Sequence, residues 1–391
     1  MYTRTIEKRF LASVKTFPVV ILTGARQTGK STLCKTLLHD THRYVSLEDP
    51  DIRRQAIEDP RTFLQNFPAP VILDEIQYAP DLPSYIQGIV DEHRTKYGQY
   101  ILTGSQNFLL MERVAQSLAG RAALLTLYPC AVQEVDGSTA KPRSSTTAVA
   151  DWILRGGYPE LRNRPELDRA TWCSSYIRLY LERDVRQLIN VTDLTTFERF
   201  VHHVAIRTGQ ILNTSDLARD VDVSVPTITR WLSVLQASYQ VFLLEPYHAS
   251  ISKRLVKAPK IYFGDTALAS YLMGIHDPEV LLQGPFLGHL FETAVVLEHL
   301  KWASMNGLNS TFSYFRTKDG IEVDLFIEQG VEIMAREIKS SRTRTTFTTK
   351  NLILAEELLQ RPLHKSILAP VSEPSIMKSG VTVKPWHQVE W

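Results

Sequence analysis

Cysteine is scarce in this chain of 391 residues, which has only Cys34, Cys130 and Cys173, far apart from one another. Their spacing excludes a cysteine metal motif and a disulfide framework, and it fits a reducing compartment. No stretch approaches 18 consecutive apolar residues, so we expect no membrane span. The apolar run at residues 17–22 is too short for a secretory signal, and we expect a cytoplasmic protein.

The chain also lacks an excess of charge of either sign. Its 44 Lys and Arg residues nearly balance 42 Asp and Glu residues, for a formal net charge of +2. This balance neither predicts nor excludes nucleic-acid binding, and any basic surface must be local. A hydrophobic content of 44% is ordinary for a globular protein. The chain is long enough for two to four domains, and length alone suggests between two and three.

What the sequence does contain is a complete phosphate-binding loop. Residues 24–31 read Gly-Ala-Arg-Gln-Thr-Gly-Lys-Ser and lie between an apolar run at 18–23, a predicted strand, and a predicted helix at 31–38. Backbone N–H groups of such a loop bind phosphate, the lysine reaches the β- and γ-phosphates, and the serine holds Mg²⁺. We therefore expect ATP and Mg²⁺ at Gly24, Ala25, Arg26, Gln27, Thr28, Gly29, Lys30, Ser31 and Thr32, with Ser31 as a metal ligand and Lys30 as a catalytic residue.

Four further apolar runs, separated by helix-length segments, predict a parallel sheet covered on both faces. They lie at residues 43–47, 70–74, 99–103 and 122–127. The run at 70–74 ends in Asp74, followed by Glu75, at the sheet edge where α/β proteins bind ligands. We expect Asp74 to support Mg²⁺ and Glu75 to activate the attacking water.

Two other polar positions follow later strands. Ser105 and Gln106 follow the run at 99–103 and could touch the γ-phosphate, or they could cap a turn. Arg121 could act as an arginine finger in a neighbouring subunit, with Arg113 as the second candidate; alternatively, Arg121 is a salt-bridged surface residue.

The segments Leu-Thr-Gly-Ala-Arg-Gln-Thr-Gly-Lys-Ser, Ile-Leu-Asp-Glu-Ile-Gln, Leu-Thr-Gly-Ser-Gln and Leu-Ala-Gly-Arg occur in this order. Together they resemble a prokaryotic family of AAA-type ATPases with a C-terminal region long catalogued as of unknown function. The resemblance extends to Gly156-Gly-Tyr-Pro-Glu160 and to residues 180–184. It implies a homo-oligomer, often a hexameric ring, with ATP between subunits.

The sequence of the middle of the chain predicts several helices followed by a helix-turn-helix. Residues 148–208 look mainly helical, and Arg183 and Arg186 lie on a charged helix that is either a solvated face or a subunit interface. Residues 213–235 predict two short helices, the first capped by Thr214 or Ser215 and the second starting at Ser224. Strands at 240–245 and 260–263 suggest a wing. This region either contacts DNA through Thr227, Thr229, Arg230, Lys253, Arg254 and Lys257 or serves only as a protein-interaction module. Trp231 is expected in the core.

The C-terminal third carries a spaced set of acids. Glu292 lies in a predicted helix, Asp324 in a predicted strand, and Glu337 and Lys339 alternate on one face of another strand. This order resembles the PD-(D/E)XK nuclease fold, with Glu322, Arg316 and Lys318 nearby. The resemblance implies Mg²⁺ or Mn²⁺ at Glu292, Asp324 and Glu337, and catalysis by Asp324, Glu337 and Lys339. Two alternatives are that the acids are ordinary exposed strand residues and that the fold is present but catalytically inactive.

These features predict an α/β protein with a parallel-sheet AAA-type ATPase domain (1–135), a helical connector (148–208), a winged helix (209–263) and a restriction-endonuclease-like α/β domain (264–391). Our leading hypothesis is a ring-forming ATPase that remodels or processes DNA, with branched DNA as a candidate substrate and with a metal-dependent nuclease site that could cut it. The competing hypothesis is a nucleotide-switched signalling or defence ATPase that acts on a protein partner and has an inactive nuclease-like domain.

Overall fold

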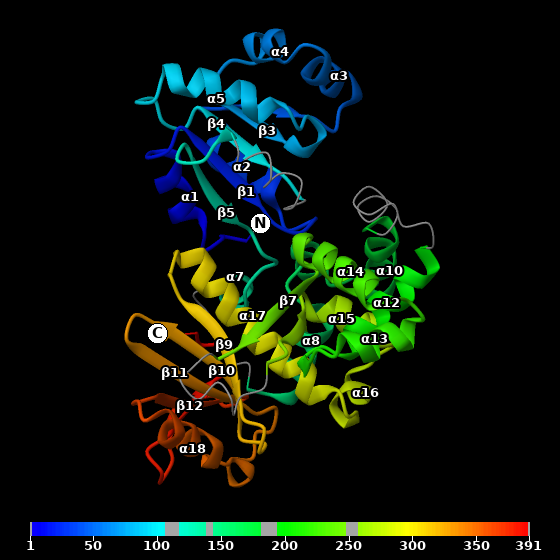
Figure 1. Ribbon diagram of the computed structural model, residues 1–391, viewed down its shortest axis with the longest axis vertical. Coiled ribbons are helices and arrows are strands. Elements are labelled where there is room, and N and C mark those ends of the chain that lie inside the picture. Colours follow the sequence, from blue (N-terminus) through cyan, green and yellow to red (C-terminus); the bar gives the residue numbers. More distant parts are fainter. Residues whose placement is uncertain (1, 106–116, 138–143, 181–193, 248–256, 390–391) are drawn as a thin grey trace. The chain divides into compact units, whose positions relative to one another are not determined.

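The computed structural model describes residues 2–105, 117–137, 144–180, 194–247 and 257–389. They form two compact units (Figure 1). The N-terminal unit comprises Met1–Cys130 with the short segments Ala237–Tyr239 and Ser304–Gly307, and the C-terminal unit comprises the rest. Within the described ranges, no helix has the length and apolar character needed to cross a membrane. The candidate residues that lie outside these ranges are Gln106, Arg113, Arg183, Arg186, Lys253 and Arg254.

The N-terminal unit is built on a five-stranded parallel sheet in the order β2-β3-β4-β1-β5. The strands confirm the five predicted runs, and the helix predicted at 31–38 is present as α2. The elements are α1 (Glu7–Val14), β1 (Val19–Thr23), α2 (Lys30–Leu38), β2 (Arg43–Ser46), α3 (Pro50–Glu58), α4 (Pro60–Asn66), β3 (Val71–Asp74), a 3₁₀ turn (Ile76–Tyr78), α5 (Leu82–Glu92), β4 (Tyr100–Thr103) and β5 (Ala122–Thr126).

Helices cover this sheet on both sides because its central strands are apolar on both faces. Strands β1, β3 and β4 are buried along their whole length. Side chains from α3, α4 and α5 join one core with alternate residues of these strands, among them Ile21 and Leu73, and Figure 1 shows these three helices together. Helices α1 and α2 pack against β1 and β4. The packing fixes the carboxyl ends of the parallel strands at one edge, where the loop after β1 begins.

The C-terminal unit combines a helical part with a nine-stranded mixed sheet in the order β13-β14-β12-β11-β10-β9-β7-β8-β6. Figure 1 shows the helices α8, α10 and α12 to α16 gathered together, and α18 near the strands β10 to β12. Helices α12 and α15 pack against β8, and α18 packs against β10 and β11. The elements are α7 (Val132–Asp136), α8 (Thr146–Arg155), α9 (Pro159–Asn163), α10 (Arg169–Tyr180), α12 (Leu194–Ile206), β6 (Gln210–Ile211), α13 (Thr214–Val221), α14 (Val225–Ala237), β7 (Val241–Pro246), β8 (Lys260–Phe263), α15 (Thr266–Leu272), α16 (Pro278–Gln283), α17 (Leu287–Asn306), β9 (Thr311–Arg316), β10 (Glu322–Gln329), β11 (Glu332–Ile338), a 3₁₀ turn (Arg344–Thr346), α18 (Lys350–Leu359), β12 (His364–Ala369), β13 (Ser375–Ile376) and β14 (Thr382–Pro385).

The division expected within residues 148–391 does not appear as separate compact units. Strands β7 and β8 form the antiparallel pair predicted after the second helix of the helix-turn-helix. However, β7 also pairs in parallel with β9, through Glu245–Ser313 and Pro246–Tyr314. The strands expected in a wing and those expected in a nuclease-like domain therefore share one sheet. The boundary expected near residue 135 lies close to the observed one at Cys130.

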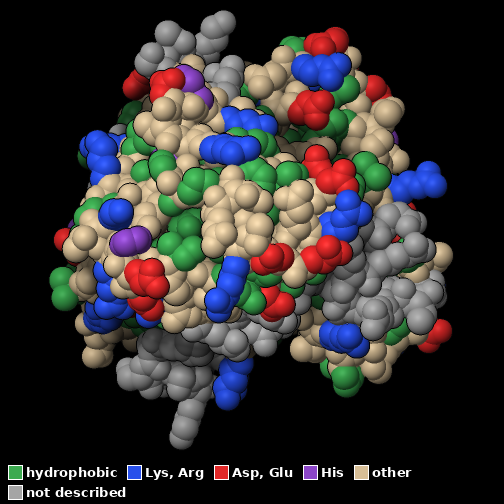
Figure 2. All heavy atoms as spheres, turned by 90° about the horizontal axis from the view of Figure 1, so that it is seen from above, with side chains coloured by type: hydrophobic (Ala, Val, Ile, Leu, Met, Phe, Trp, Pro, Cys, Tyr) green, Lys and Arg blue, Asp and Glu red, His purple; other side chains and the backbone are tan. Residues whose placement is uncertain are grey.

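Charged side chains of both signs are mixed on the face seen in Figure 2. This mixture accords with the formal net charge of +2. A site for an anionic partner therefore has to be identified from particular residues and not from the charge of a whole face.

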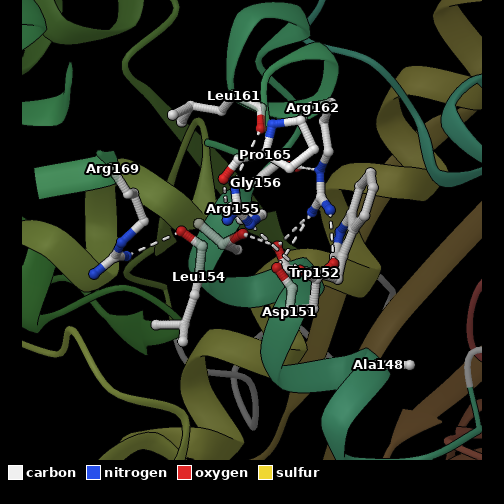
Figure 3. Close-up of polar contacts among 12 residues, drawn as sticks. Ala148, Asp151, Trp152, Leu154, Arg155, Gly156, Leu161, Arg162, Pro165 and Arg169 are labelled. Carbon is white, nitrogen blue, oxygen red and sulfur yellow. Dashed lines mark hydrogen bonds and ion pairs between the residues drawn. The ribbon is translucent and has the colours of Figure 1, made fainter. Parts of the chain in front are cut away.

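Arg155, Arg162 and Arg169 donate to backbone carbonyl groups around the end of α8 (Figure 3). Arg162 Nε donates to the carbonyl oxygen of Gly156 at 2.6 Å, and Arg169 Nη1 donates to that of Leu154 at 2.9 Å. The Arg162 guanidinium also pairs with Asp151 and lies 4.3 Å from the centroid of the Trp152 ring. Cations at a helix C-terminus stabilise it because the last carbonyl groups lack helical partners.

Gly156 follows α8 where a side chain cannot be accommodated. Its backbone angles, φ 59° and ψ −154°, belong to a region that is essentially restricted to glycine. A Cβ atom there would lie 2.0 Å from Oδ1 of Asp265. That buried carboxylate accepts N–H bonds from Gly157 and Ala267, both at 2.8 Å. The first glycine of the sequence Gly-Gly-Tyr-Pro-Glu is thus explained by the close approach of Asp265.

We expect Gly156→Ala to lower the free energy of unfolding by well over about 2 kcal/mol, because backbone strain adds to the displacement of Asp265. Gly274→Ala is the control, since Gly274 also has a positive φ (73°) but has no atom within 4 Å of the position that a Cβ would take. It should cost about 1–2 kcal/mol. Denaturant unfolding of both variants measures the difference, and equal losses would contradict the role given to Asp265.

His299 on α17 gives the fold a dependence on pH. Burial lowers its pKa from 6.5 to about 4, although its Nδ1 lies 2.9 Å from the carbonyl oxygen of Val295. The unfolded chain therefore binds a proton at a higher pH than the folded chain does. The stability contribution of the neutral ring is complete above about pH 6.5 and is lost as the pH falls towards 4, by at most about 3 kcal/mol.

We expect His299→Gln to flatten this part of the curve of unfolding free energy against pH. His93→Gln, at an exposed histidine, should leave the curve unchanged. Denaturant titrations between pH 4 and 7 provide the measurement, and a slope that survives in His299→Gln would assign the dependence to other groups.

Candidate nucleotide site and acid–lysine cluster

The loop between β1 and α2 has the backbone of a phosphate site. Gly24 has φ 141°, and a Cβ atom there would lie 2.1 Å from the carbonyl oxygen of Leu127. Gly29 precedes α2 with φ 95°, in the left-handed region, and as a glycine it gives α2 no side-chain cap. The first turn of α2 lies at the positive end of the helix dipole, where backbone N–H groups bind anions. Glycine is thus required at Gly24 by the close approach of Leu127 and is favoured at Gly29 by the left-handed backbone.

Lys30 and Arg4 donate hydrogen bonds to backbone carbonyl groups at different residues of the loop. Lys30 is buried, and its Nζ donates to the carbonyl oxygens of Gly24 at 3.0 Å and Ala25 at 2.8 Å. Arg4 Nη1 donates to the carbonyl oxygen of Thr28 at 2.8 Å. The lysine ammonium therefore lies against the loop that would surround the phosphates. Sequence reasoning did not identify Arg4, which precedes the first helix and belongs to no motif.

Asp74 lies at the carboxyl end of β3 and is brought to Ser31, as the sequence predicts. Ser31 Oγ donates to the carboxylate at 2.9 Å, and the hydroxyl groups of Tyr44 and Thr103 donate to it as well. Burial and the hydrogen bond to Asp74 raise the pKa of the Tyr44 phenol. Oxygen ligands of this kind suit Mg²⁺, so Ser31 and Asp74 fit the role of holding the ion, which would neutralise charge on the phosphates.

Glu75 is held in an unusual backbone conformation beside Asp74. Its φ of 58° and ψ of 51° are left-handed, which costs a non-glycine residue roughly 1–3 kcal/mol. Its carboxylate accepts hydrogen bonds from Ser105 Oγ at 3.2 Å and from the side-chain amide of Gln77. Ser105, expected at the γ-phosphate, thus contacts the expected catalytic acid. Strain at a residue with this position is typical of functional sites.

Arg121 is engaged within its own unit. Its Nε and Nη2 donate to the two carboxylate oxygens of Asp91 at 2.7 and 2.8 Å. The hydrogen bond from Arg121 lowers the pKa of Asp91. The structure therefore shows the alternative given above, a salt-bridged surface arginine, and gives no support to a role as arginine finger.

The helix-turn-helix region has the expected two helices, α13 and α14. The cap of α13 is Asn213 and not Thr214 or Ser215: its Oδ1 accepts N–H bonds from Ser215 and Asp216, both at 3.1 Å. Trp231 packs 5.1 Å from the ring centroid of Phe197, which confirms its place in the core. The exposed residues of α14 include Thr229 and Arg230, while Thr227 is half-buried and Lys257 is exposed before β8.

Four carboxylates and two lysines meet in the C-terminal unit, and we call this group the acid–lysine cluster. Strand β8 supplies Lys260, and its Nζ lies 2.9 Å from Glu292, 2.6 Å from Glu322 and 3.7 Å from Asp324. Lys339 pairs with Glu337 at 2.6 Å, as alternation along one strand face predicts. The cluster consists of Glu292, Glu322, Asp324, Glu337, Lys260 and Lys339.

Asp324 is directed into this cluster by an irregularity in β10. The pairing of β10 with β9 shifts register between Val323 and Phe326, as in a β-bulge, which re-aims side chains. Asp324 Oδ2 accepts the backbone N–H of Ile338 at 2.7 Å. Burial and the neighbouring Glu292 raise the pKa of Asp324. Burial and Asp324 raise the pKa of Glu337 in turn.

The predicted metal site does not form as such. Among the described residues, no group of three or more His, Cys, Asp or Glu side chains is arranged to hold a metal ion. The acids Glu292 and Asp324 instead face the ammonium group of Lys260, and Glu337 faces Lys339. Sequence reasoning missed Lys260 because it lies in the expected wing strand, far from the acids in the chain.

Comparison with known proteins divides the chain into three matched regions. Residues 16–136 match the model of an AAA domain. Residues 146–279 and 287–389 match two domains of unknown function, DUF8612 and DUF4143. The N-terminal unit is thus a P-loop ATPase domain of the AAA type.

The chain is 32% identical over 344 residues to the uncharacterized protein Rv2008c of Mycobacterium tuberculosis, and equally to Mb2031c of Mycobacterium bovis. The aligned region covers 88% of this chain and 75% of each relative. The chain belongs to the family of these mycobacterial proteins. An uncharacterized protein of Haemophilus influenzae is 20% identical over 86% of both chains.

Solved structures show only distant likenesses. The Walker-type ATPase PABY2304 of Pyrococcus abyssi is 15% identical, with 70% of this chain and 96% of that one covered and a TM-score of 0.45. The RuvB Holliday junction branch migration motor of Thermotoga maritima is 14% identical, with coverage of 61% and 88% and a TM-score of 0.30. Neither likeness bears on what this chain binds.

We expect Glu75→Gln to reduce ATP turnover on the order of 10²–10⁴-fold, because the amide cannot accept a proton from water. Nucleotide binding should remain, since Lys30 and the loop are untouched. Glu58→Gln, at an exposed glutamate of the same unit, is the matched control. Steady-state phosphate release and titration with a fluorescent ATP analogue separate the two effects; full turnover in Glu75→Gln would remove this residue from the mechanism.

Proposed function

We propose that this protein is an ATP-hydrolysing, ring-forming ATPase whose C-terminal unit binds DNA and uses nucleotide turnover to remodel it. The observation that carries the hydrolytic part is the convergence of Lys30, Ser31, Asp74 and Glu75 at one edge of the parallel sheet. That edge is where α/β proteins bind their ligands.

Each residue of the nucleotide site has a distinct task in this proposal. The α2 N-terminus and Lys30 bind the β- and γ-phosphates. Ser31 and Asp74 hold Mg²⁺. Glu75 orients the attacking water and accepts its proton, while the hydrogen bonds from Ser105 and Gln77 keep its carboxylate in place.

The helices α13 and α14 support the DNA-binding part. They are joined by a short turn through Asp222, whose φ of 62° ends α13. The exposed face of α14 offers Thr229 and Arg230, which suit phosphate oxygens and base edges. The proposed function does not extend to metal-dependent cleavage, because Lys260 lies among the carboxylates that would be needed.

The test is steady-state ATP hydrolysis with and without single-stranded, duplex, forked and four-way DNA. We expect one DNA form to stimulate turnover and Lys30→Ala to abolish turnover under every condition. Light scattering with and without an ATP analogue tests for the ring. Turnover that is indifferent to all four DNA forms would favour the competing hypothesis, a switch that acts on a protein partner.

Arg230→Ala examines the DNA contact by itself. Loss of one phosphate contact should weaken binding of the preferred DNA and lower the slope of log affinity against log salt by about 1. Gln236→Ala, at another exposed position of α14, is the control and should bind as the wild type does. Identical slopes in both variants would place the DNA elsewhere.

A further inference from the structure

Lys260 is buried in the middle of the acid–lysine cluster. Only 3% of it is exposed, and its Nζ lies within 3.7 Å of carboxylates on α17 and β10. The ammonium group also lies 5.5 Å from the centroid of the buried Tyr314 ring. Because β8 pairs with both β6 and β7, the backbone of this lysine is fixed inside the sheet.

The charge of Lys260 is stabilised by its neighbours despite its burial. Burial opposes the charge, but Glu292, Asp324 and Glu322 together outweigh it and raise the pKa of the lysine. An ammonium ion buried without such partners would be strongly destabilising. The buried ammonium group therefore requires the acids to remain charged, and removal of either partner would leave a buried charge unpaired.

The three carboxylates that face Lys260 each have a further donor of their own. Tyr262 donates to Glu292 at 2.6 Å, Arg316 pairs with Glu322 at 2.9 Å, and the N–H of Ile338 donates to Asp324. A divalent ion entering this group would meet a fixed positive charge at about the distance of a ligand. The repulsion between the ammonium group and the ion opposes metal binding, and it is twice as large for a divalent ion as for a monovalent one.

We propose that Lys260 is the resident cation of this cluster and that it replaces the divalent metal ion which the nuclease-like pattern implies. The lysine joins β8 to α17 and β10, and Glu292, Asp324 and Glu337 bind no Mg²⁺ or Mn²⁺ while it is present. This inference concerns the C-terminal unit and is independent of ATP hydrolysis.

The experiment is a titration of the full chain with Mn²⁺, without nucleotide, followed by electron paramagnetic resonance of the free ion. The wild type and Asp324→Asn should give the same binding curve, because any binding near Ser31 and Asp74 is common to both. Lys260→Ala should bind one more Mn²⁺ per chain than the wild type does. The double variant Lys260→Ala/Asp324→Asn should lose that ion.

Lys365→Ala is the matched control, since it removes another lysine paired with a glutamate, Glu356, away from the cluster. It should leave Mn²⁺ binding unchanged, and Lys260→Arg should behave as the wild type does. One Mn²⁺ bound by the wild type and lost in Asp324→Asn would overturn the proposal, whether or not Lys260→Ala folds. A folded Lys260→Ala that gains no ion would overturn it too.

Discussion

The carboxylate of Asp74 is the contact on which the nucleotide site depends. It accepts hydrogen bonds from Ser31 on α2, Tyr44 on β2 and Thr103 on β4, and so joins the helix after the phosphate loop to two neighbouring strands. A buried carboxylate requires such donors, and without it three hydroxyl groups would lose their acceptor. Glu75, the next residue, is positioned by the same arrangement.

The sequence was sufficient to predict the N-terminal sheet and the pair Ser31 and Asp74, because continuous apolar runs and fixed motif spacing are local signals. It could not identify Tyr44, Thr103 or Gln77 as partners of the acids. Each is an ordinary residue for its element. Only the strand order β2-β3-β4-β1-β5 brings Tyr44 and Thr103 to Asp74, and Gln77 contacts Glu75 through the local 3₁₀ turn. Ser105 was predicted at the right edge but with a different partner.

In the C-terminal half the elements were predicted more accurately than their arrangement. The acids at 292, 324 and 337 do approach one another, and β7 and β8 do form a hairpin-like pair. The parallel pairing of β7 with β9 was not predictable, since strand pairing across distant segments depends on long-range contacts that local patterns do not encode. That pairing merges the expected wing with the expected nuclease-like sheet and carries Lys260 to the acids.

The two acidic sites of this chain differ in the charge of the donors that surround them. Asp74 is satisfied by three neutral hydroxyl groups, so a divalent ion adds positive charge where the described contacts supply none. Glu292, Glu322 and Asp324 are already opposed by an ammonium group. A pattern of acids in sequence is the same in both situations, because it reports the ligands and not the cation that they face. Whether such a pattern binds metal is therefore decided by a residue outside it, here the first residue of β8.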